Sequence, residues 1–318
     1  MFNALQQLSA PKARLVCAHL ILVALWGCGD GPAQMEAAAL DTSGPAHEDA
    51  LSAACDFSGT WAVKFEIPVA WRFNPGISSG SGTIEQWALV NRRVLDDQTL
   101  EEVVRPCGSA IPTYRALSIY GGEQYGVGFP DALFDSGVLP TLTGTTWIGG
   151  QSPGHYYDTR PLPLTLGVDL PEASTAAWPK RVSELAPYIV DSDEDGQPGV
   201  TAVAREDGSL VLPPVNTTKS RRATKFHIAL RNVIGARGQI VSCDRFEGSA
   251  VVAQVGGKPA ISSTILGCEL TDSSACSRAQ ATLANTFQPA YQVGEDSRSV
   301  MVRVHDEATC AQVRALTF

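Results

Sequence analysis

Six cysteines spread over residues 55–310 limit how this chain can fold. An even number of cysteines in an exported chain predicts disulfide bonds, and six cysteines allow fifteen pairings. A zinc site is the alternative, and the absence of any C-x-x-C pair disfavours it. We therefore expect three disulfides among Cys55, Cys107, Cys243, Cys268, Cys276 and Cys310.

The N-terminal segment predicts export. Lys12 and Arg14 precede an apolar run over residues 15–26 that contains no acidic side chain. A basic start, a short apolar run and a small residue at the end are typical of a secretory signal. The run is too short for a membrane-spanning helix, which needs about 20 apolar residues. The expected signal covers residues 1–27.

The end of this signal, Leu25-Trp26-Gly27-Cys28, resembles the lipobox of bacterial lipoproteins. The resemblance implies cleavage before Cys28, a diacylglycerol on its sulfur and a further acyl chain such as palmitate on its amine. Trp26 departs from the small or aliphatic residue usual in the motif. Gly29, where Asp would favour the inner membrane, implies anchoring in the outer membrane. Two or more acyl chains give lasting attachment, which one chain does not.

The composition of the mature chain indicates which functions are disfavoured and where its folded domain begins. Removing Lys12 and Arg14 from the 24 basic residues leaves 22 against 33 acidic ones, a formal charge of −11. This disfavours nucleic-acid binding, which needs a clustered basic surface. Residues 28–54 are small and acidic, and we expect a flexible tether there. Residues 55–318 form the expected folded domain, with a subdivision near 170–242 left open.

Periodicity and turn residues predict a mainly β fold. We expect an antiparallel barrel or sandwich of short strands, with long Gly/Pro loops and a short C-terminal helix over residues 307–316 that is capped by Asp306. Residues 121–163 read as extended loops. The expected strands cover residues 60–67, 83–90, 116–120, 163–168, 200–204, 209–212, 223–230, 248–255, 260–270 and 298–304.

An internal similarity suggests one disulfide pattern. Residues 55–63 and 243–251 both read Cys-Asp, then Phe, Gly, a small hydroxyl residue and Ala-Val, with a one-residue offset. If this is a duplication, it pairs Cys55 with Cys107 and Cys243 with Cys310, and Cys268 with Cys276 closes a small loop. A chance match is the alternative.

An acidic loop is the clearest chemical signal in the mature chain. Asp191, Asp193 and Asp195 alternate before Gly196, and Gln197 offers a carbonyl, a pattern that suits calcium. It resembles the first half of the calcium loops of EF-hands, dockerins and thrombospondin type 3 repeats. Position 12 is Ala202, so the closing carboxylate is missing and Glu206 or Asp207 would have to replace it. A solvated acidic turn is the alternative.

Signals for catalysis are weak. Ser152 lies in a G-x-S-x-G pattern, but Pro153 has no N–H to donate to an oxyanion. Ser78 lies in a second match, within a Gly/Ser tract that precedes a strand rather than a helix. Among the histidines of the folded domain, His155, His227 and His305, we single out only His155 with Asp158 as a local pair. We expect no enzyme; a serine hydrolase that uses Ser78 is the disfavoured alternative.

Ser58-Gly59-Thr60-Trp61 resembles the Gly-x-Trp signature with which lipocalins and other calycins open their first strand. The resemblance implies a closed antiparallel barrel that carries a small hydrophobic ligand. The sequence as a whole predicts an envelope lipoprotein that acts as a non-enzymatic binding or structural module. Its expected partners are the membrane through the lipid anchor, and either an envelope protein or a small hydrophobic ligand.

Overall fold

The computed structural model describes residues 54–73, 79–115, 124–205, 210–211, 222–286 and 289–318. The predicted signal, Cys28 and nearly all of the predicted tether lie outside these ranges. Residues 51–318 form one compact unit.

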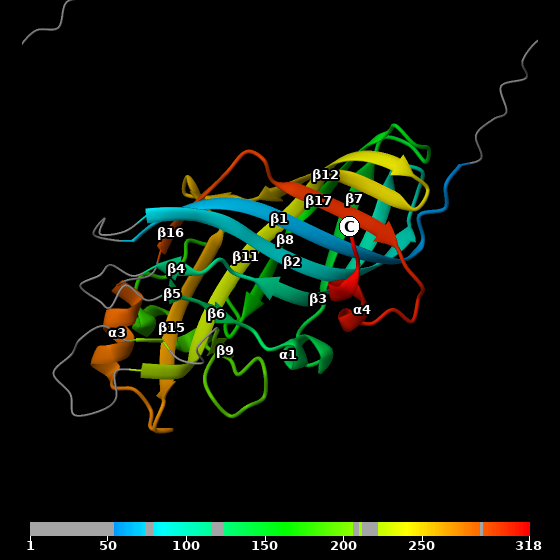
Figure 1. The fold of residues 1–318 in the computed structure, drawn as a ribbon. Coiled ribbons are helices and arrows are strands. Elements are labelled where there is room, and N and C mark those ends of the chain that lie inside the picture. The colour runs from blue at the N-terminus through cyan, green and yellow to red at the C-terminus, as the bar shows by residue number, and fades with distance from the viewer. Residues whose placement is uncertain (1–53, 74–78, 116–123, 206–209, 212–221, 287–288) are drawn as a thin grey trace, which may run out of the picture. The chain divides into compact units, whose positions relative to one another are not determined.

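Eight strands of the main sheet hydrogen-bond in a closed ring (Figure 1). Each pairs antiparallel with the next in chain order, and the last pairs with the first. The fold is therefore an up-and-down antiparallel ring, which confirms the predicted fold class. The ring strands are β1 (Gly59–Phe73), β2 (Ser79–Val94), β3 (Thr99–Ala110), β7 (Leu142–Ile148), β8 (Tyr156–Leu166), β11 (Arg222–Ser242), β12 (Arg245–Val252) and β17 (Arg298–Arg303).

Two long strands belong both to the ring and to an extension of the sheet. Residues 61–66 of β1 pair with β17, whereas residues 69–73 pair with β16 (Pro289–Val293). The first half of β11 pairs with β9 (Val200–Ala204) and β15 (Ile261–Leu270), and its second half with β8 and β12. The ring therefore continues at one end into a wider sheet.

The remaining elements are short. Strand β6 (Val127–Gly128) pairs with β9, and β10 (Leu210–Val211) pairs with β11. Two small hairpins form from β4 (Tyr114–Arg115) with β5 (Gln124–Tyr125), and from β13 (Gln254–Val255) with β14 (Lys258–Pro259). The helices are α1 (Asp131–Asp135), α2 (Val182–Leu185), the 3-10 helix η2 (Ala186–Tyr188), α3 (Arg278–Thr286) and α4 (Cys310–Ala315).

Alternation along β1 separates two packed faces. Trp61, Val63, Ile67 and Val69 are almost fully buried inside the ring. Ala62 lies on the opposite face and packs with residues of α4. Farther along β1 the outward side chains include Lys64, Glu66 and the exposed Arg72, so this part alternates between apolar and polar residues as a strand with one buried face does.

Several sequence expectations need correction. Strands β7 and most of β8 occupy residues 142–163, which were expected to be loop. Their signal was weak because the outward positions of β7 carry Thr and an exposed Trp147 rather than charged residues. Helix α3 was not expected. The expected strand at 116–120 lies outside the described residues, and only Leu210 and Val211 are described within the one at 209–212.

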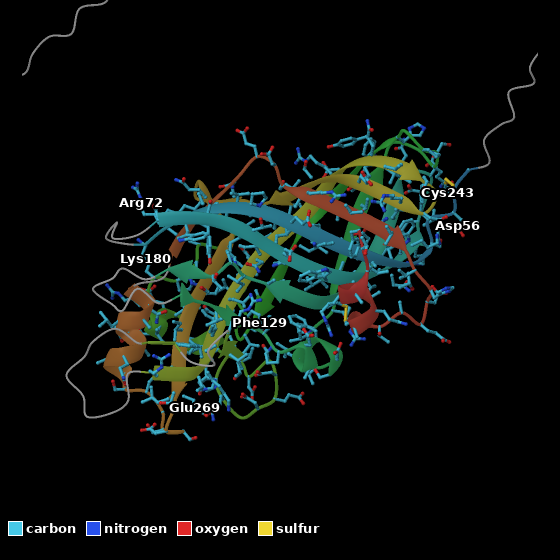
Figure 2. The ribbon with its side chains drawn as sticks, in the orientation of Figure 1. Asp56, Arg72, Phe129, Lys180, Cys243 and Glu269 are labelled. Carbon is cyan, nitrogen blue, oxygen red and sulfur yellow. A yellow bond between two sulfur atoms is a disulfide. The ribbon has the colours of Figure 1, made fainter. Side chains whose placement is uncertain are left out.

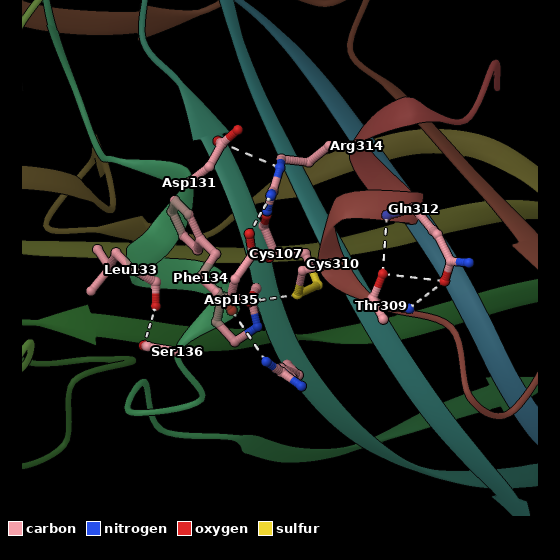
Figure 3. Close-up of a disulfide and its surroundings, with 12 residues drawn as sticks. Cys107, Asp131, Leu133, Phe134, Asp135, Ser136, Thr309, Cys310, Gln312 and Arg314 are labelled. Atoms are coloured by element: carbon pink, nitrogen blue, oxygen red, sulfur yellow. Dashed lines mark hydrogen bonds and ion pairs between the residues drawn. A yellow bond between two sulfur atoms is a disulfide. The ribbon is translucent and has the colours of Figure 1, made fainter.

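Helix α4 confirms the predicted C-terminal helix with a different cap. Thr309, not Asp306, forms the capping box with Gln312 (Figure 3). Asp306 instead accepts a hydrogen bond of 2.9 Å from the Thr60 hydroxyl at the start of β1. Arg314 of α4 donates to the Cys107 carbonyl at 2.7 Å and pairs with Asp135 at 2.8 Å, which joins α4 to α1 and β3.

All six expected cysteines form disulfides, but two of the three predicted pairs are wrong. The bonds join Cys55 to Cys243, Cys107 to Cys310, and Cys268 to Cys276. Cys55 precedes β1 and Cys243 lies in the β11–β12 turn, and both are near the same end of the ring because β17 lies between β1 and β12. The two Cys-Asp segments are thus bonded to each other. Cys268–Cys276 is confirmed.

These connections predict unequal contributions to stability. With Cys55–Cys243 intact, the shortest path from Cys107 to Cys310 runs back to Cys55, through that disulfide and on from Cys243, roughly 120 residues in all. Cys268 and Cys276 are only eight residues apart. Cys107→Ser with Cys310→Ser should therefore lower the free energy of unfolding by about 2 kcal/mol more than Cys268→Ser with Cys276→Ser. Guanidinium titration of both double variants measures this difference. If the two double variants lost equal free energies of unfolding, or if the Cys268/Cys276 variant lost more, the result would contradict this disulfide connectivity.

Candidate functional site

One end of the ring is closed by aromatic rings around Trp61. The Phe246 ring lies edge-on to those of Trp61 and Phe57, with both centroid distances 5.1 Å. The Trp61 indole N–H donates to the Phe57 carbonyl at 3.1 Å. Trp61, Phe57 and Phe246 are each fully buried. This end of the ring is therefore held by aromatic packing as well as by the Cys55–Cys243 disulfide.

Arg303 fastens the chain entering the ring to this closed end. Its guanidinium lies 4.8 Å from the Trp61 ring and donates to the Ser58 carbonyl, the Asp56 carbonyl and the Asp244 carboxylate. Both Cys-Asp segments are therefore held by one side chain. Figure 2 labels Asp56 and Cys243 at this end, and Arg72 far from them near the other end of β1.

A buried ion pair lies inside the ring next to the aromatic cluster. Arg92 of β2 and Glu102 of β3 are register partners, 2.7 Å apart, and their side chains are 0% and 2% exposed. The Arg92 guanidinium also lies 4.6 Å from the Phe246 ring. Removing one member of such a pair leaves a buried charge and costs about 3–5 kcal/mol. The interior thus carries two charges that cancel.

Further polar side chains face the interior on neighbouring strands. Tyr157 of β8 is fully buried, and burial raises its pKa to about 12, so the phenol is neutral at physiological pH. The nearby Ser299 side chain of β17 lowers the pKa of Tyr157, but by less than burial raises it. The Ser299 hydroxyl has no hydrogen-bond partner of ordinary geometry. Gln86 of β2 is 9% exposed.

Four of these polar side chains carry atoms without a hydrogen-bond partner. Among the described residues, six buried side-chain nitrogen or oxygen atoms have none, and four of the six lie inside the ring. Buried polar groups in native proteins are nearly always satisfied, so a concentration of this kind is informative. The four are Gln86 Nε2, Arg92 Nη1, Tyr157 OH and Ser299 Oγ.

The other half of the interior is apolar. Ile67, Val69 and Trp71 of β1 pack with Ile84, Ile234 and Ala250 from β2, β11 and β12. Partly buried hydrophobic side chains extend this cluster toward the wider sheet: Ile111, Val252, Ile261, Tyr291 and Val293. Phe65 packs against both this cluster and the one around Trp61, so it stands at their junction.

The chain matches no family model, no curated protein and no solved structure. Function must therefore be argued from the residues and their geometry. Among the described residues, no helix has the length and apolarity required to cross a membrane.

The predicted calcium loop brings its three aspartates together. One carboxylate oxygen from each of Asp191, Asp193 and Asp195 lies within 4.8 Å of the others. Glu194 and Gly196 adopt positive φ, which bends the loop. Hydrogen bonds from backbone N–H groups, Gly196 first, lower the pKa of Asp191 against the opposing effect of burial. Burial, together with the charge of Asp195, raises the pKa of Asp193.

This loop is also tied to the sheet through Thr201 of β9. The Thr201 N–H donates to Asp193 at 2.8 Å and its hydroxyl donates to Asp195 at 2.6 Å. The same hydroxyl oxygen lies 3.1 Å from Nδ1 of His227 on β11. Asp193 Oδ1 is buried without a partner and Ala202 is fully buried, while Glu206 and Asp207 lie outside the described residues. The donor set fits a hard cation with few protein ligands.

Of the two serines in the predicted hydrolase patterns, the structure describes only Ser152. Ser78 lies outside the described residues. Ser152 lies in the β7–β8 turn, where its carbonyl accepts from the His155 N–H at 3.4 Å, and no hydrogen bond joins its hydroxyl to a described histidine. Nδ1 of His227 lies 3.1 Å from the Thr201 hydroxyl rather than beside a serine of either pattern that the structure describes.

The polar residues inside the ring were not identified from the sequence. Arg92 and Glu102 have charged neighbours, Arg93 and Glu101, and a charged pair in a strand normally indicates an exposed face. Their inward orientation follows from strand register. The only sequence signal was a two-residue alternation that places Arg92 on the same face as Val90 and Ala88.

Proposed function

We propose that this protein is a non-enzymatic binding module of the cell envelope, anchored in the outer membrane through Cys28, whose ring holds a small, mainly apolar ligand. The observation that carries the proposal is the closed ring of eight strands with one end filled by aromatic rings and the other lined by hydrophobic side chains. Small antiparallel barrels of this kind have interiors that side chains fill or that hold one small ligand.

The apolar half is the part of the ring suited to a hydrophobic ligand. Six partly buried hydrophobic side chains pack against its buried cluster, compared with three for the cluster around Trp61. Burying such surface against a ligand is favourable by about 25 cal/mol per Å². A protein partner is the second candidate, because Trp147 and Tyr156 on the outer wall are 46% and 42% exposed.

Quenching of Trp71 tests ligand binding in the ring. The probe is 1-bromodecane, an uncharged hydrocarbon chain whose bromine quenches tryptophan at contact distance. Trp71 is 8% exposed within the apolar cluster, so saturable quenching by one molecule per chain is expected in the wild type. Trp71→Phe should abolish most of it, whereas Trp147→Phe, which alters an exposed outer-wall residue, should leave it intact. Quenching lost only in Trp147→Phe would place the probe outside the ring.

Anchoring is tested at Cys28. The native protein should begin at Cys28 and carry a diacylglycerol and an amide-linked acyl chain, measured by mass spectrometry of its N-terminal peptide. Cys28→Ser should move the protein from the membrane fraction to the soluble fraction or leave its signal uncut. Cys17→Ser is the matched control, because that cysteine lies in the segment to be removed. A mature chain that begins elsewhere would contradict the anchor.

We propose that Asp191, Asp193 and Asp195, with the Gln197 carbonyl, hold a calcium ion that stabilises the loop. The supporting observations are the convergence of the three carboxylates and the unpartnered Asp193 oxygen. A site with few charged ligands should bind weakly, with a dissociation constant on the order of 10⁻⁴–10⁻³ M. Bound calcium would offset the repulsion between the carboxylates.

Calcium at 5 mM should therefore raise the free energy of unfolding by about 1–2 kcal/mol relative to the chelated protein. Asp193→Asn should remove this response and leave the metal-free protein equally or more stable, because it removes a half-buried charge beside Asp195. Asp169→Asn, an exposed aspartate outside the cluster, is the control. Thermal unfolding with and without chelator measures both, and an identical unfolding temperature in the wild type would contradict the site.

A further inference from the structure

Three of the four side chains with unpartnered polar atoms inside the ring lie along one run of strand-register partners. Tyr157 pairs with Gly238, Gly238 with Gly248, and Gly248 with Ser299. Neither glycine places a side chain between the two hydroxyl residues. Ser299 pairs in turn with Phe65, and Phe65 with Gln86. Tyr157, Ser299 and Gln86 therefore lie along one run of register partners, which defines a polar level of the ring.

Arg92 connects this level with the closed end. Its charge acts on Tyr157 closely enough to lower the pKa of that phenol, as Glu102 acts to raise it. Arg92 donates Nε and Nη2 to Glu102 and to the Met301 sulfur, which leaves Nη1 without an acceptor. Gln86 Nε2 is likewise a donor, and the two hydroxyls can donate or accept.

We propose that this level is a head-group site: it binds the uncharged, hydrogen-bond-accepting end of an otherwise apolar ligand, such as the carbonyl of an ester, a ketone or an amide. The inference rests on the proposed function, because the apolar half of the ring would hold the rest of the ligand. An accepting oxygen takes a hydrogen bond from the surplus donor Arg92 Nη1 and from the hydroxyl of Tyr157, because the Arg92 guanidinium and the Tyr157 ring both contact the Phe246 ring. Each of these residues is more than nine-tenths buried.

The charge balance of the interior selects an uncharged head group over a carboxylate. Arg92 is already neutralised by Glu102, and both side chains are buried. A carboxylate would bring an uncompensated negative charge next to Glu102, and an unpaired buried charge is strongly unfavourable. A carbonyl adds hydrogen bonds without adding charge.

Phe65 defines how such a head group reaches this level. Its ring packs against both apolar clusters and is only partly buried, at the level shared by Gln86 and Ser299. A ligand that enters from the apolar half meets the Phe65 side chain before the four polar atoms.

Three ligands of matched chain length test the inference: methyl decanoate, decanoate and undecane, each titrated directly into the purified full chain by calorimetry. Methyl decanoate should bind about tenfold more tightly than undecane, because it fills otherwise unpartnered hydrogen-bonding groups. It should also bind more tightly than decanoate. Equal binding of methyl decanoate and undecane would overturn the head-group site but leave the proposed function standing. Failure of all three ligands and of 1-bromodecane to bind would overturn both.

Two adjacent tyrosines supply a matched pair of variants. Tyr157→Phe removes only the buried hydroxyl, so the preference for the ester over undecane should fall at least threefold. The unfolding temperature of the free protein should stay the same or rise, because the lost hydroxyl has no partner there. Tyr156→Phe, on the exposed outer face, should change neither quantity. An unchanged ester preference in Tyr157→Phe, or tighter binding of decanoate than of the ester, would overturn the inference.

Discussion

The packing of Arg303 on Trp61 ties together the segments that meet where the ring closes. Strand β17, which carries Arg303, lies between β12 and β1 and so supplies the last set of ladder hydrogen bonds. Arg303 also binds backbone carbonyls that precede β1 and the Asp244 carboxylate in the β11–β12 turn. One side chain thereby joins three segments that are far apart in sequence. Residue 303 is also a strand partner of Trp61, so ring closure and the aromatic cluster depend on the same register.

The polar side chains inside the ring are not explained by a contribution to the stability of the fold. A buried ion pair such as Arg92–Glu102 is often no more stabilising than apolar side chains of similar volume. Unpartnered buried hydroxyl and amide groups are each unfavourable by about 1–3 kcal/mol. A ring filled for stability alone would carry hydrophobic side chains at these positions, as it does at Ile67 and Val69. The concentration of such groups at one level of the ring therefore favours a role in binding.

The sequence predicted the β class, the six bonded cysteines and the C-terminal helix because each leaves a local signal. It could not give the two long-range disulfide pairs, since Cys55 and Cys243 meet only through the register of β1, β17 and β12. The aspartates of the candidate calcium loop were found because their spacing is local. Arg92, Glu102, Tyr157 and Ser299 were missed because four separate strands bring them together, and an inward-facing charge resembles a surface charge in a single strand.

The length of β1 relates the two halves of the interior to the point where the chain enters the ring. Cys55 and Asp56 lie at the closed end with Trp61, and Trp71 lies in the apolar half, roughly 33 Å farther along β1 than Trp61 at about 3.3 Å per residue. A chain anchored ahead of Cys55 would be attached to the closed end. The apolar half lies at the end of the ring remote from the point where the chain enters it at Cys55. The disulfide and the Arg303 contacts reinforce the end that would bear the anchor.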